Sequence, residues 1–132
     1  MRKKLVLFLF FFCSIITSAQ QKVTVSSPDK KLRFSLQVTP EDLSYKIDYK
    51  KQPIITNSLL GFDFDSGEFC NNLLVGKVRR KFIDETYKLL IGKVSTARNH
   101  CNEAIIPLLE PTTERRINLI VRVFDDGVAF RY

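Results

Sequence analysis

The sequence predicts an all-β protein, an antiparallel β-sandwich, and three observations support this fold class. Apolar and polar residues alternate one by one over residues 32–38 and again over residues 43–49, as in strands that bury one face. Turn-forming residues recur about every eight to twelve residues, which is typical of sandwiches and barrels. No stretch of useful length carries an apolar stripe with a period of about 3.6 residues, so we expect no helices.

The strands are expected in order along the chain, separated by polar turns such as residues 39–42, 50–53 and 65–68. Beyond the two alternating strands, further candidates lie at residues 54–56, 60–64, 73–78, 87–91, 104–109 and 117–123. We find no internal repeat, low-complexity stretch or linker in the sequence. Residues 20–132 are therefore expected to form one domain.

The last predicted element is a hairpin around Asp125-Asp126-Gly127, with Gly127 supplying a positive φ between two apolar runs. The return strand carries Val128 and Phe130, and the sequence ends at Tyr132 without a polar tail. An unpaired apolar strand end promotes aggregation. We therefore expect either that this strand docks into a sheet as its final strand or that residues which should follow it are missing.

The N-terminal residues 1–19 have the layout of a secretory signal peptide. A basic start is followed by twelve mainly apolar residues from Leu5 to Ile16 and by the small residues Thr17-Ser18-Ala19. Twelve residues are too few for a comfortable membrane span, so cleavage before Gln20 is expected. The sequence thus predicts an exported protein, periplasmic or secreted, that has no membrane partner after cleavage.

Removal of residues 1–19 leaves 18 Lys and Arg against 14 Asp and Glu, a net charge of +4 instead of +7. So mild an excess of cations gives little reason to expect a nucleic-acid partner and is explained by solubility. The cysteines that remain are Cys70 and Cys101. In an oxidising compartment they could form one disulfide, and two buried free thiols are an equal alternative, because sequence spacing does not place them within bridging distance.

The densest polar cluster is residues 98–103, Arg-Asn-His-Cys-Asn-Glu. His, Cys and Glu side chains bind metals or move protons. On a strand, however, His100 and Asn102 share one face while Cys101 and Glu103 share the other, so the cluster cannot form one local metal site unless a bulge intervenes. Two interpretations stay open: hydrogen-bonded structural residues, or part of an interface or ligand pocket built with other segments.

Other charged groups have simpler explanations. The basic runs at residues 79–81 and 114–116 are expected to be solvated strand surface. The acidic residues at 63, 65, 68, 84 and 85 lack the ordered spacing of a calcium loop. The sequence has no Gly-x-Ser-x-Gly motif, no phosphate-cradling glycine loop and no His-Glu-x-x-His motif. From the residues alone we assign no catalytic residue and no metal ligand.

Several stretches, in order, resemble one family. Residues 25–32 (VSSPDKKL) resemble its opening SPDGKL, with Lys30 where the family has Gly. Residues 43–49 with 52–55, residues 98–103 and residues 116–122 continue the pattern, and residues 125–132 (DDGVAFRY) match it throughout. Together they resemble the N-terminal domain of glycoside hydrolase family 97, which includes α-glucosidases and α-galactosidases of Bacteroides-type bacteria.

The resemblance implies an incomplete sandwich, part of a larger super-sandwich, that precedes a (β/α)8 barrel. In the family the barrel carries the catalytic carboxylates and a calcium ion, and it binds the oligosaccharide. No catalytic residue carries over to this sequence, so this chain, truncated before the barrel, is expected to be inactive alone and to need no cofactor of its own. The candidate contacts with the barrel or substrate are Arg98, His100, Asn102 and Glu103. The family more often has Asp at the position of Asn99 and Tyr at that of Cys101.

Two other functions stay open, a stand-alone carbohydrate-binding module and a cell-envelope domain that binds a protein. Sugar-binding modules usually present exposed aromatic side chains. This sequence has no Trp, and its tyrosines, at 45, 49, 87 and 132, fall mostly in alternating strands that suggest burial. The sugar specificity and the retaining or inverting mechanism of a parent enzyme are not determined by the sequence.

Overall fold

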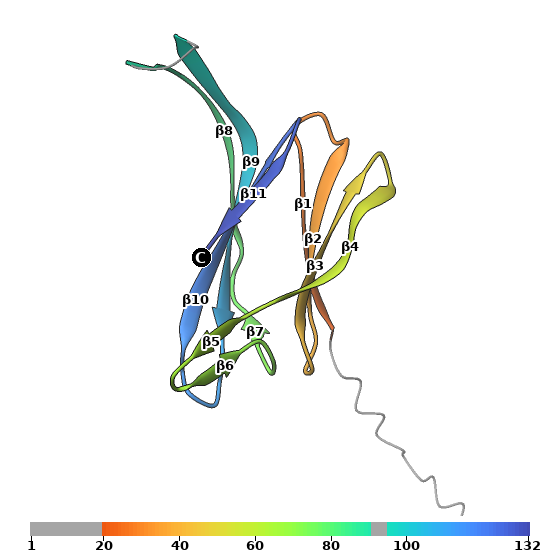
Figure 1. Ribbon diagram of the computed structural model, residues 1–132, viewed down its shortest axis with the longest axis vertical. Coiled ribbons are helices and arrows are strands. Elements are labelled where there is room, and N and C mark those ends of the chain that lie inside the picture. Colours follow the sequence, from red (N-terminus) through yellow and green to blue (C-terminus); the bar gives the residue numbers. More distant parts are fainter. Residues whose placement is uncertain (1–19, 91–94) are drawn as a thin grey trace, which may run out of the picture.

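The computed structural model describes residues 20–90 and 95–132 and is built of antiparallel strands (Figure 1). The predicted signal peptide lies outside the described residues. The first sheet is a meander in the order β1-β2-β3-β4. Its strands are β1 (Gln21–Ser26), β2 (Leu32–Val38), β3 (Leu43–Tyr49) and β4 (Gln52–Leu60).

The second sheet has the order β11-β10-β9-β7, and β8 also pairs with β9. Its strands are β7 (Leu74–Val75), β8 (Arg79–Lys88), β9 (Thr96–Leu109), β10 (Arg116–Phe124) and β11 (Val128–Arg131). A small hairpin of β5 (Phe62–Phe64) and β6 (Gly67–Phe69) lies at one end of this sheet (Figure 1). The described strands do not close into a barrel, and none of the described residues form a helix able to span a membrane.

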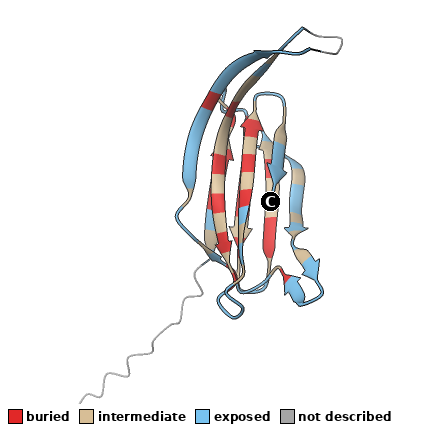
Figure 2. Ribbon diagram, turned by 90° about the vertical axis from the view of Figure 1, so that its left-hand side faces the viewer, coloured by how far each residue is buried: buried red, intermediate tan, exposed pale blue. Residues whose placement is uncertain are grey.

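The two sheets face each other (Figure 1), and the hydrophobic core draws its residues from both; Figure 2 shows buried residues at intervals along the strands. Alternate residues of β2 and β3 face alternate residues of β9 and β10, because side chains on a strand point to opposite faces in turn. The fully buried side chains include Phe34, Leu36, Ile106, Leu119 and Val121. The all-β antiparallel fold expected from the sequence is thus confirmed, and the strands at 32–38 and 43–49 have the predicted bounds.

Several expected strands have different bounds. The candidate at 87–91 is instead the long strand β8, which ends at Lys88, and residue 91 lies outside the described part. The candidate at 73–78 shrinks to the two residues of β7. Asn72, with φ 50°, precedes it, and beyond Val75 the Gly76 amide still donates to the Pro107 carbonyl at 2.8 Å, but Pro107 has no amide hydrogen to continue the ladder. The strand β1 was not expected, since its apolar residues are few.

The final hairpin is present, and one detail of its prediction is wrong. β10 and β11 pair from Ile120–Arg131 to Val123–Val128, and the Phe124 amide donates to the Gly127 carbonyl at 2.8 Å. Gly127 does not have a positive φ. A four-residue loop closes this hairpin, so its glycine does not need the left-handed conformation that a two-residue loop would impose.

Left-handed backbone occurs instead at residues that seldom adopt it. Outside glycine, a positive φ is found at Lys30, Lys50, Lys51, Asn72 and Glu114. For an L-residue other than Asn or Asp this conformation costs roughly 1–2 kcal/mol relative to right-handed backbone. Three of these five positions are lysines in the two turns at one end of the first sheet.

Candidate functional site

The strands β8 and β9 continue past both sheets as a two-stranded arm (Figure 1). The register of β9 with β10 ends at the pair Cys101–Phe124, whereas β8 stays paired with β9 as far as Thr96–Lys88. We call residues 84–90 and 95–100 the arm. No third strand among the described residues pairs with it. Two-stranded hairpins are marginally stable in water, so the arm depends on contacts at its base or on a partner.

Apolar side chains are exposed on the arm and at its base. Phe82, at the base, is 56% exposed, and Tyr87 is 52% exposed on the arm itself. Leu90, near the tip, is fully exposed at 100%. Figure 2 shows that the arm is almost entirely solvent-accessible, in contrast to the strands below it. By strand alternation Phe82 and Tyr87 lie on opposite faces of β8, so this projecting element offers exposed apolar side chains for interaction on both of its faces.

The four candidate residues all lie on β9, and the predicted division between its faces is confirmed. Arg98, His100 and Asn102 alternate on one face with the cross-strand partners Phe82 and Asp84 of β8. Glu103 points to the opposite face, where its carboxylate accepts a 2.7 Å hydrogen bond from Arg122. The structure therefore brings three of the four together and separates Glu103 from them.

Arg98 is held by a carboxylate on the neighbouring strand. Its Nε and Nη2 atoms donate to the two oxygens of Asp84, each at 2.8 Å, as a bidentate pair. This hydrogen bond lowers the pKa of Asp84 below its usual value and raises that of Arg98. The pair fixes the register of the arm while leaving both side chains partly exposed.

His100 and Asn102 fasten the base of the arm to two turns. The His100 Nδ1 lies 3.3 Å from Asp125 Oδ2, and the other oxygen of that carboxylate accepts the backbone amide of Asp29 at 2.9 Å. The Asn102 side-chain amide donates to the Ser26 carbonyl at 2.8 Å. The contact of His100 with Asp125 and the hydrogen bond of Asn102 place the base of the arm against the β10–β11 turn and the end of β1, so His100 and Asn102 position it.

A groove of about 460 Å³ runs between the edge strand β1 and the base of the arm. Phe82 and Asn102 contribute a ring and an amide to it, and Arg80 and Lys81 contribute positive charge. The ring of His100 packs edge-on against Phe82 with 5.4 Å between centroids. The groove thus joins an aromatic surface to hydrogen-bonding groups, a combination that can contact a sugar or a protein segment.

Sequence reasoning missed the residues that give this region its surface. The roles of Phe82 and of Asp84 depend on the pairing of β8 with β9. This strand was not predicted at its start, because the basic residues 79–81 interrupt the apolar alternation. The expectation that the tyrosines are mostly buried is wrong, because Tyr49, Tyr87 and Tyr132 are exposed and Tyr45 is half-buried. Tyr49 is the last residue of β3, Tyr87 lies on the arm, and Tyr132 follows the edge strand β11, so alternation in sequence did not lead to burial at these ends and edges.

Arg115 also differs from expectation, since it is not a solvated surface residue. Its guanidinium donates to both oxygens of the buried Glu110, at 2.7 and 2.9 Å, and to the carbonyls of Gly67 and Glu68. The hydrogen bond from Arg115 is the main cause that lowers the pKa of Glu110. Arg115 therefore ties the β9–β10 turn to the β5–β6 hairpin.

The two cysteines are free thiols in this structure. Cys101 is fully buried on the outer face of β9, and burial is the main cause that raises its pKa. The Cys70 thiol donates to Glu68 at 3.4 Å, and burial also raises its pKa. Raised thiol pKa values disfavour the reactive thiolate, so neither cysteine has the properties of a nucleophile. Of the two alternatives left open, the structure contains the free thiols.

Within residues 20–90 and 95–132, no three His, Cys, Asp or Glu side chains gather in an arrangement able to hold a metal ion. The calcium ion implied by the family resemblance therefore finds no ligand set in the part of the chain described here. We derive no chemistry through it.

The fold and the arm together define a class of protein: an antiparallel β-sandwich module with an exposed arm that can contact another domain or protein. Comparison with known proteins identifies the family. Residues 25–132 match the family described as Glycosyl-hydrolase 97 N-terminal. This match covers most of the chain, and the chain belongs to that family.

The relatives are glycoside hydrolases several times longer than this chain. A retaining alpha-galactosidase of Bacteroides thetaiotaomicron is 27% identical over 133 residues, which cover 100% of this chain and 19% of the relative. A probable retaining alpha-galactosidase of Streptomyces bingchenggensis is 26% identical over 132 residues, which cover 96% of this chain and 21% of the relative.

Solved structures give the same result. A glycoside hydrolase family 97 enzyme from Pseudoalteromonas sp. strain K8, in complex with acarbose, superposes with a TM-score of 0.78 and 28% identity. The match covers 83% of this chain and 17% of that enzyme. A beta-arabinopyranosidase superposes with a TM-score of 0.76 and 30% identity, over 83% of this chain and 18% of the other. The chain thus spans about a fifth of the length of its relatives.

Proposed function

We propose that this chain is the N-terminal β-sandwich of an exported α-glycosidase and that it packs against a catalytic (β/α)8 barrel and helps to close its active site. The observation that most supports this contact is the arm. It exposes Tyr87 and Leu90 beyond the body of the sandwich, with Phe82 at its base. Membership in the family supports a catalytic part as the partner. The substrate class would be the oligosaccharides on which such enzymes act.

His100 and Asn102 take a positioning role in this proposal. Their bonds to Asp125 and to the Ser26 carbonyl fix the angle at which the arm leaves the sandwich. Arg98, paired to Asp84, stiffens the arm itself. The candidate residues therefore serve the barrel contact by orienting the apolar side chains that make it.

A chimeric enzyme tests the barrel contact. In the Bacteroides thetaiotaomicron alpha-galactosidase, the matching N-terminal segment would be replaced by residues 25–132 of this chain, and hydrolysis of p-nitrophenyl α-galactoside would be measured with calcium present. We expect an active chimera in which Tyr87→Asp combined with Leu90→Asp lowers kcat/KM at least about tenfold, because small misplacements near an active site are costly.

The matched control is Ile54→Asp combined with Leu59→Asp, which introduces the same charges at exposed apolar residues of β4. This control should leave kcat/KM within about twofold of the parent chimera, since surface substitutions away from special features have small effects. Equal losses in the two double variants, or none in the arm variant, would contradict the proposal.

The chain alone is expected to show no glycosidase activity. Purified chain would be incubated with p-nitrophenyl α-glucoside and p-nitrophenyl α-galactoside in the presence of calcium. Turnover above background would overturn this expectation.

Export is part of the same proposal and rests on the layout of residues 1–19. Expression in a Gram-negative host with cell fractionation should recover a periplasmic or secreted product that begins at Gln20. An uncleaved product in the cytoplasm would contradict it.

The exposure of Phe82 beside Asn102 favours a second candidate function, direct sugar binding in the groove between β1 and the arm. Titration of the full chain with maltooligosaccharides, followed by calorimetry, distinguishes this function from the first. Saturable binding that is lost in Phe82→Ala would favour a carbohydrate-binding module.

A further inference from the structure

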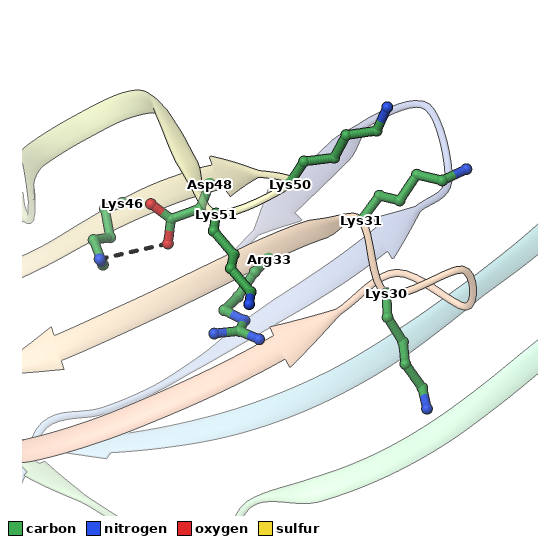
Figure 3. Close-up of a pocket in the computed structure, with 7 residues that line it drawn as sticks. All are labelled: Lys30, Lys31, Arg33, Lys46, Asp48, Lys50 and Lys51. Atoms are coloured by element: carbon green, nitrogen blue, oxygen red, sulfur yellow. Dashed lines mark ion pairs between the residues drawn. The ribbon is translucent and has the colours of Figure 1, made fainter.

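Positive charge is concentrated at one end of the first sheet, around a hollow of about 580 Å³ (Figure 3). We call its cationic lining the basic tract, which consists of Lys30, Lys31, Arg33, Lys46, Lys50 and Lys51. These are six of the 18 Lys and Arg in residues 20–132. One acid, Asp48, shares the lining, and Lys46 lies 3.4 Å from it.

Most of this charge is not compensated. Lys31 pairs with Asp29 at 2.9 Å, on the turn that carries Lys30. Within the described residues no ion pair is formed by Lys30, Arg33, Lys50 or Lys51. A solvated strand surface usually mixes the two signs of charge. The basic tract instead holds like charges close together, which is unfavourable unless an anion lies among them.

Lysine occupies backbone positions here that favour other residues. Lys50 and Lys51, with φ 48° and 69°, are the two central residues of the β3–β4 turn, where Asn-Gly is preferred because both residues need a positive φ. Lys30, with φ 62°, occupies the left-handed position of the β1–β2 turn, which favours glycine. Strain of this kind at three lysines is a reason to look for a function of their charge.

The two turns form one surface. The Lys50 amide donates to the Lys31 carbonyl at 2.8 Å, which joins them side by side. Figure 3 shows Lys51 and Arg33 reaching over one face of the sheet while Lys50 and Lys31 extend to one side and Lys30 to another. The charges therefore spread over a surface instead of converging on a single point, which suits an extended polyanion better than one small anion.

The basic tract continues over the edge strand β1. Lys30 and Arg33 also line the 460 Å³ groove beside the arm, to which Arg80 and Lys81 add two more cations. Arg80 is fixed there because it donates to the Thr24 carbonyl at 2.8 Å. A linear ligand could therefore run from the turns of the first sheet into this groove.

We propose that the basic tract binds an anionic polysaccharide through its sulfate or carboxylate groups. The choice of a polysaccharide rests on the proposed function, since the family consists of carbohydrate-active enzymes. A nucleic acid is less suitable, because its bases would need aromatic rings on which to stack. No aromatic residue lines the hollow, and the Lys50 ammonium lies over the nearby Tyr49 ring, 5.2 Å from its centroid. The tract also has no apolar side chain in its lining to insert into a membrane.

Binding of the full chain to defined probes tests this proposal. The probes are a heparin oligosaccharide for sulfate, oligogalacturonate for carboxylate, and maltoheptaose as the neutral sugar. We expect saturable binding of at least one anionic sugar, an affinity that falls steeply as salt is added, and no measurable binding of maltoheptaose. The sugar that binds more tightly identifies the anionic group.

The decisive variant is Lys30→Gly combined with Lys50→Gly and Lys51→Gly. It removes three charges at positions whose backbone suits glycine, so its thermal unfolding temperature should equal or exceed that of the parent. Its affinity for the anionic sugar should fall at least about tenfold. The matched control, Lys77→Gln with Lys88→Gln and Arg116→Gln, removes equal charge elsewhere and should change the affinity less than about twofold.

Three results would overturn the proposal. The matched control could lose as much affinity as the glycine variant, which would indicate unspecific attraction to net charge. Single-stranded DNA or phosphatidylglycerol vesicles could bind more tightly than either anionic sugar, which would show that the ligand is a nucleic acid or a membrane and not a polysaccharide. If neither anionic sugar bound at low salt, the proposed binding site would be excluded. Because this assay contains no catalytic barrel, its failure is distinct from failure of the chimeric enzyme.

Discussion

The two halves of β9 belong to one continuous strand and lie in different environments. From Ala104 to Leu109 the strand is flanked by β10 and faces the first sheet, and its alternate residues Ala104, Ile106 and Leu108 are buried. From Thr96 to His100 it pairs with β8 alone, and these residues are exposed or only partly buried (Figure 2). Both halves are regular strand, but only residues 104–109 have the first sheet packed against them.

This difference indicates where the stability of the domain resides. Burial between two sheets removes apolar surface from water at roughly 25 cal/mol per Å², and the arm has no opposing layer to provide it. The arm is held by polar contacts at its base and by the bidentate pair of Arg98 and Asp84. We therefore expect residues 104–109 of β9 to contribute most to the free energy of unfolding and residues 96–100 to be available for binding.

Truncation of one apolar residue in the core part of β9 and one on β8 at the base of the arm gives the largest expected contrast. Ile106→Ala should lower the free energy of unfolding by about 2–5 kcal/mol, because it leaves a cavity in the core. Phe82→Ala, at the exposed base of the arm, should lower it by less than about 1 kcal/mol. Urea titration followed by circular dichroism measures both values, and similar losses would show that the arm is part of the folding core.

Two arginine–carboxylate pairs provide a second, smaller contrast. Arg115→Gln should destabilise the domain more than Arg98→Gln, because Glu110 is buried whereas Asp84 is partly exposed. Loss of Arg115 also frees the carbonyls of Gly67 and Glu68. Urea midpoints at pH 7 test this order, and a larger effect at Arg98 would contradict it.

The stability of the parent and that of Arg115→Gln should differ in their dependence on pH. The pKa of Glu110 is lowered from its usual 4.5, so its pair stabilises the fold fully above that pH. As the pH falls below 4.5 through the lowered pKa, protonation removes this stabilisation. The parent should therefore lose stability on acidification more steeply than Arg115→Gln. Parallel curves between pH 7 and pH 3 would show that the pair does not contribute in this way.

The smallest expected effect is a gain from Lys30→Gly alone. Relief of left-handed strain offsets the larger entropy of glycine in the unfolded chain, and the net result should be about 0–1 kcal/mol of added stability. Lys31→Gly is the matched control, since Lys31 does not have a positive φ and should lose stability. A loss at Lys30 equal to that at Lys31 would indicate that lysine is accommodated there without strain.

Several elements could be predicted from the sequence because their information is local. Period-two alternation with clear turn residues fixed β2 and β3 to the residue, and Asp125-Asp126-Gly127 marked the last hairpin. The division of His100 and Asn102 from Glu103 followed from strand geometry alone. β8 could not be bounded in this way, because charged residues interrupt its pattern and its pairing with β9 spans residues distant in sequence.

The sequence by itself determined the all-β class, the two regular strands and the family, since these depend on short-range patterns and on ordered motifs. Only the tertiary structure decided that Tyr87 and Leu90 are exposed, that Arg115 is anchored and that six cations gather around one hollow. The physical reason is that exposure and proximity depend on which strands face one another, and a strand without a facing layer leaves its apolar residues in water whatever its alternation suggests.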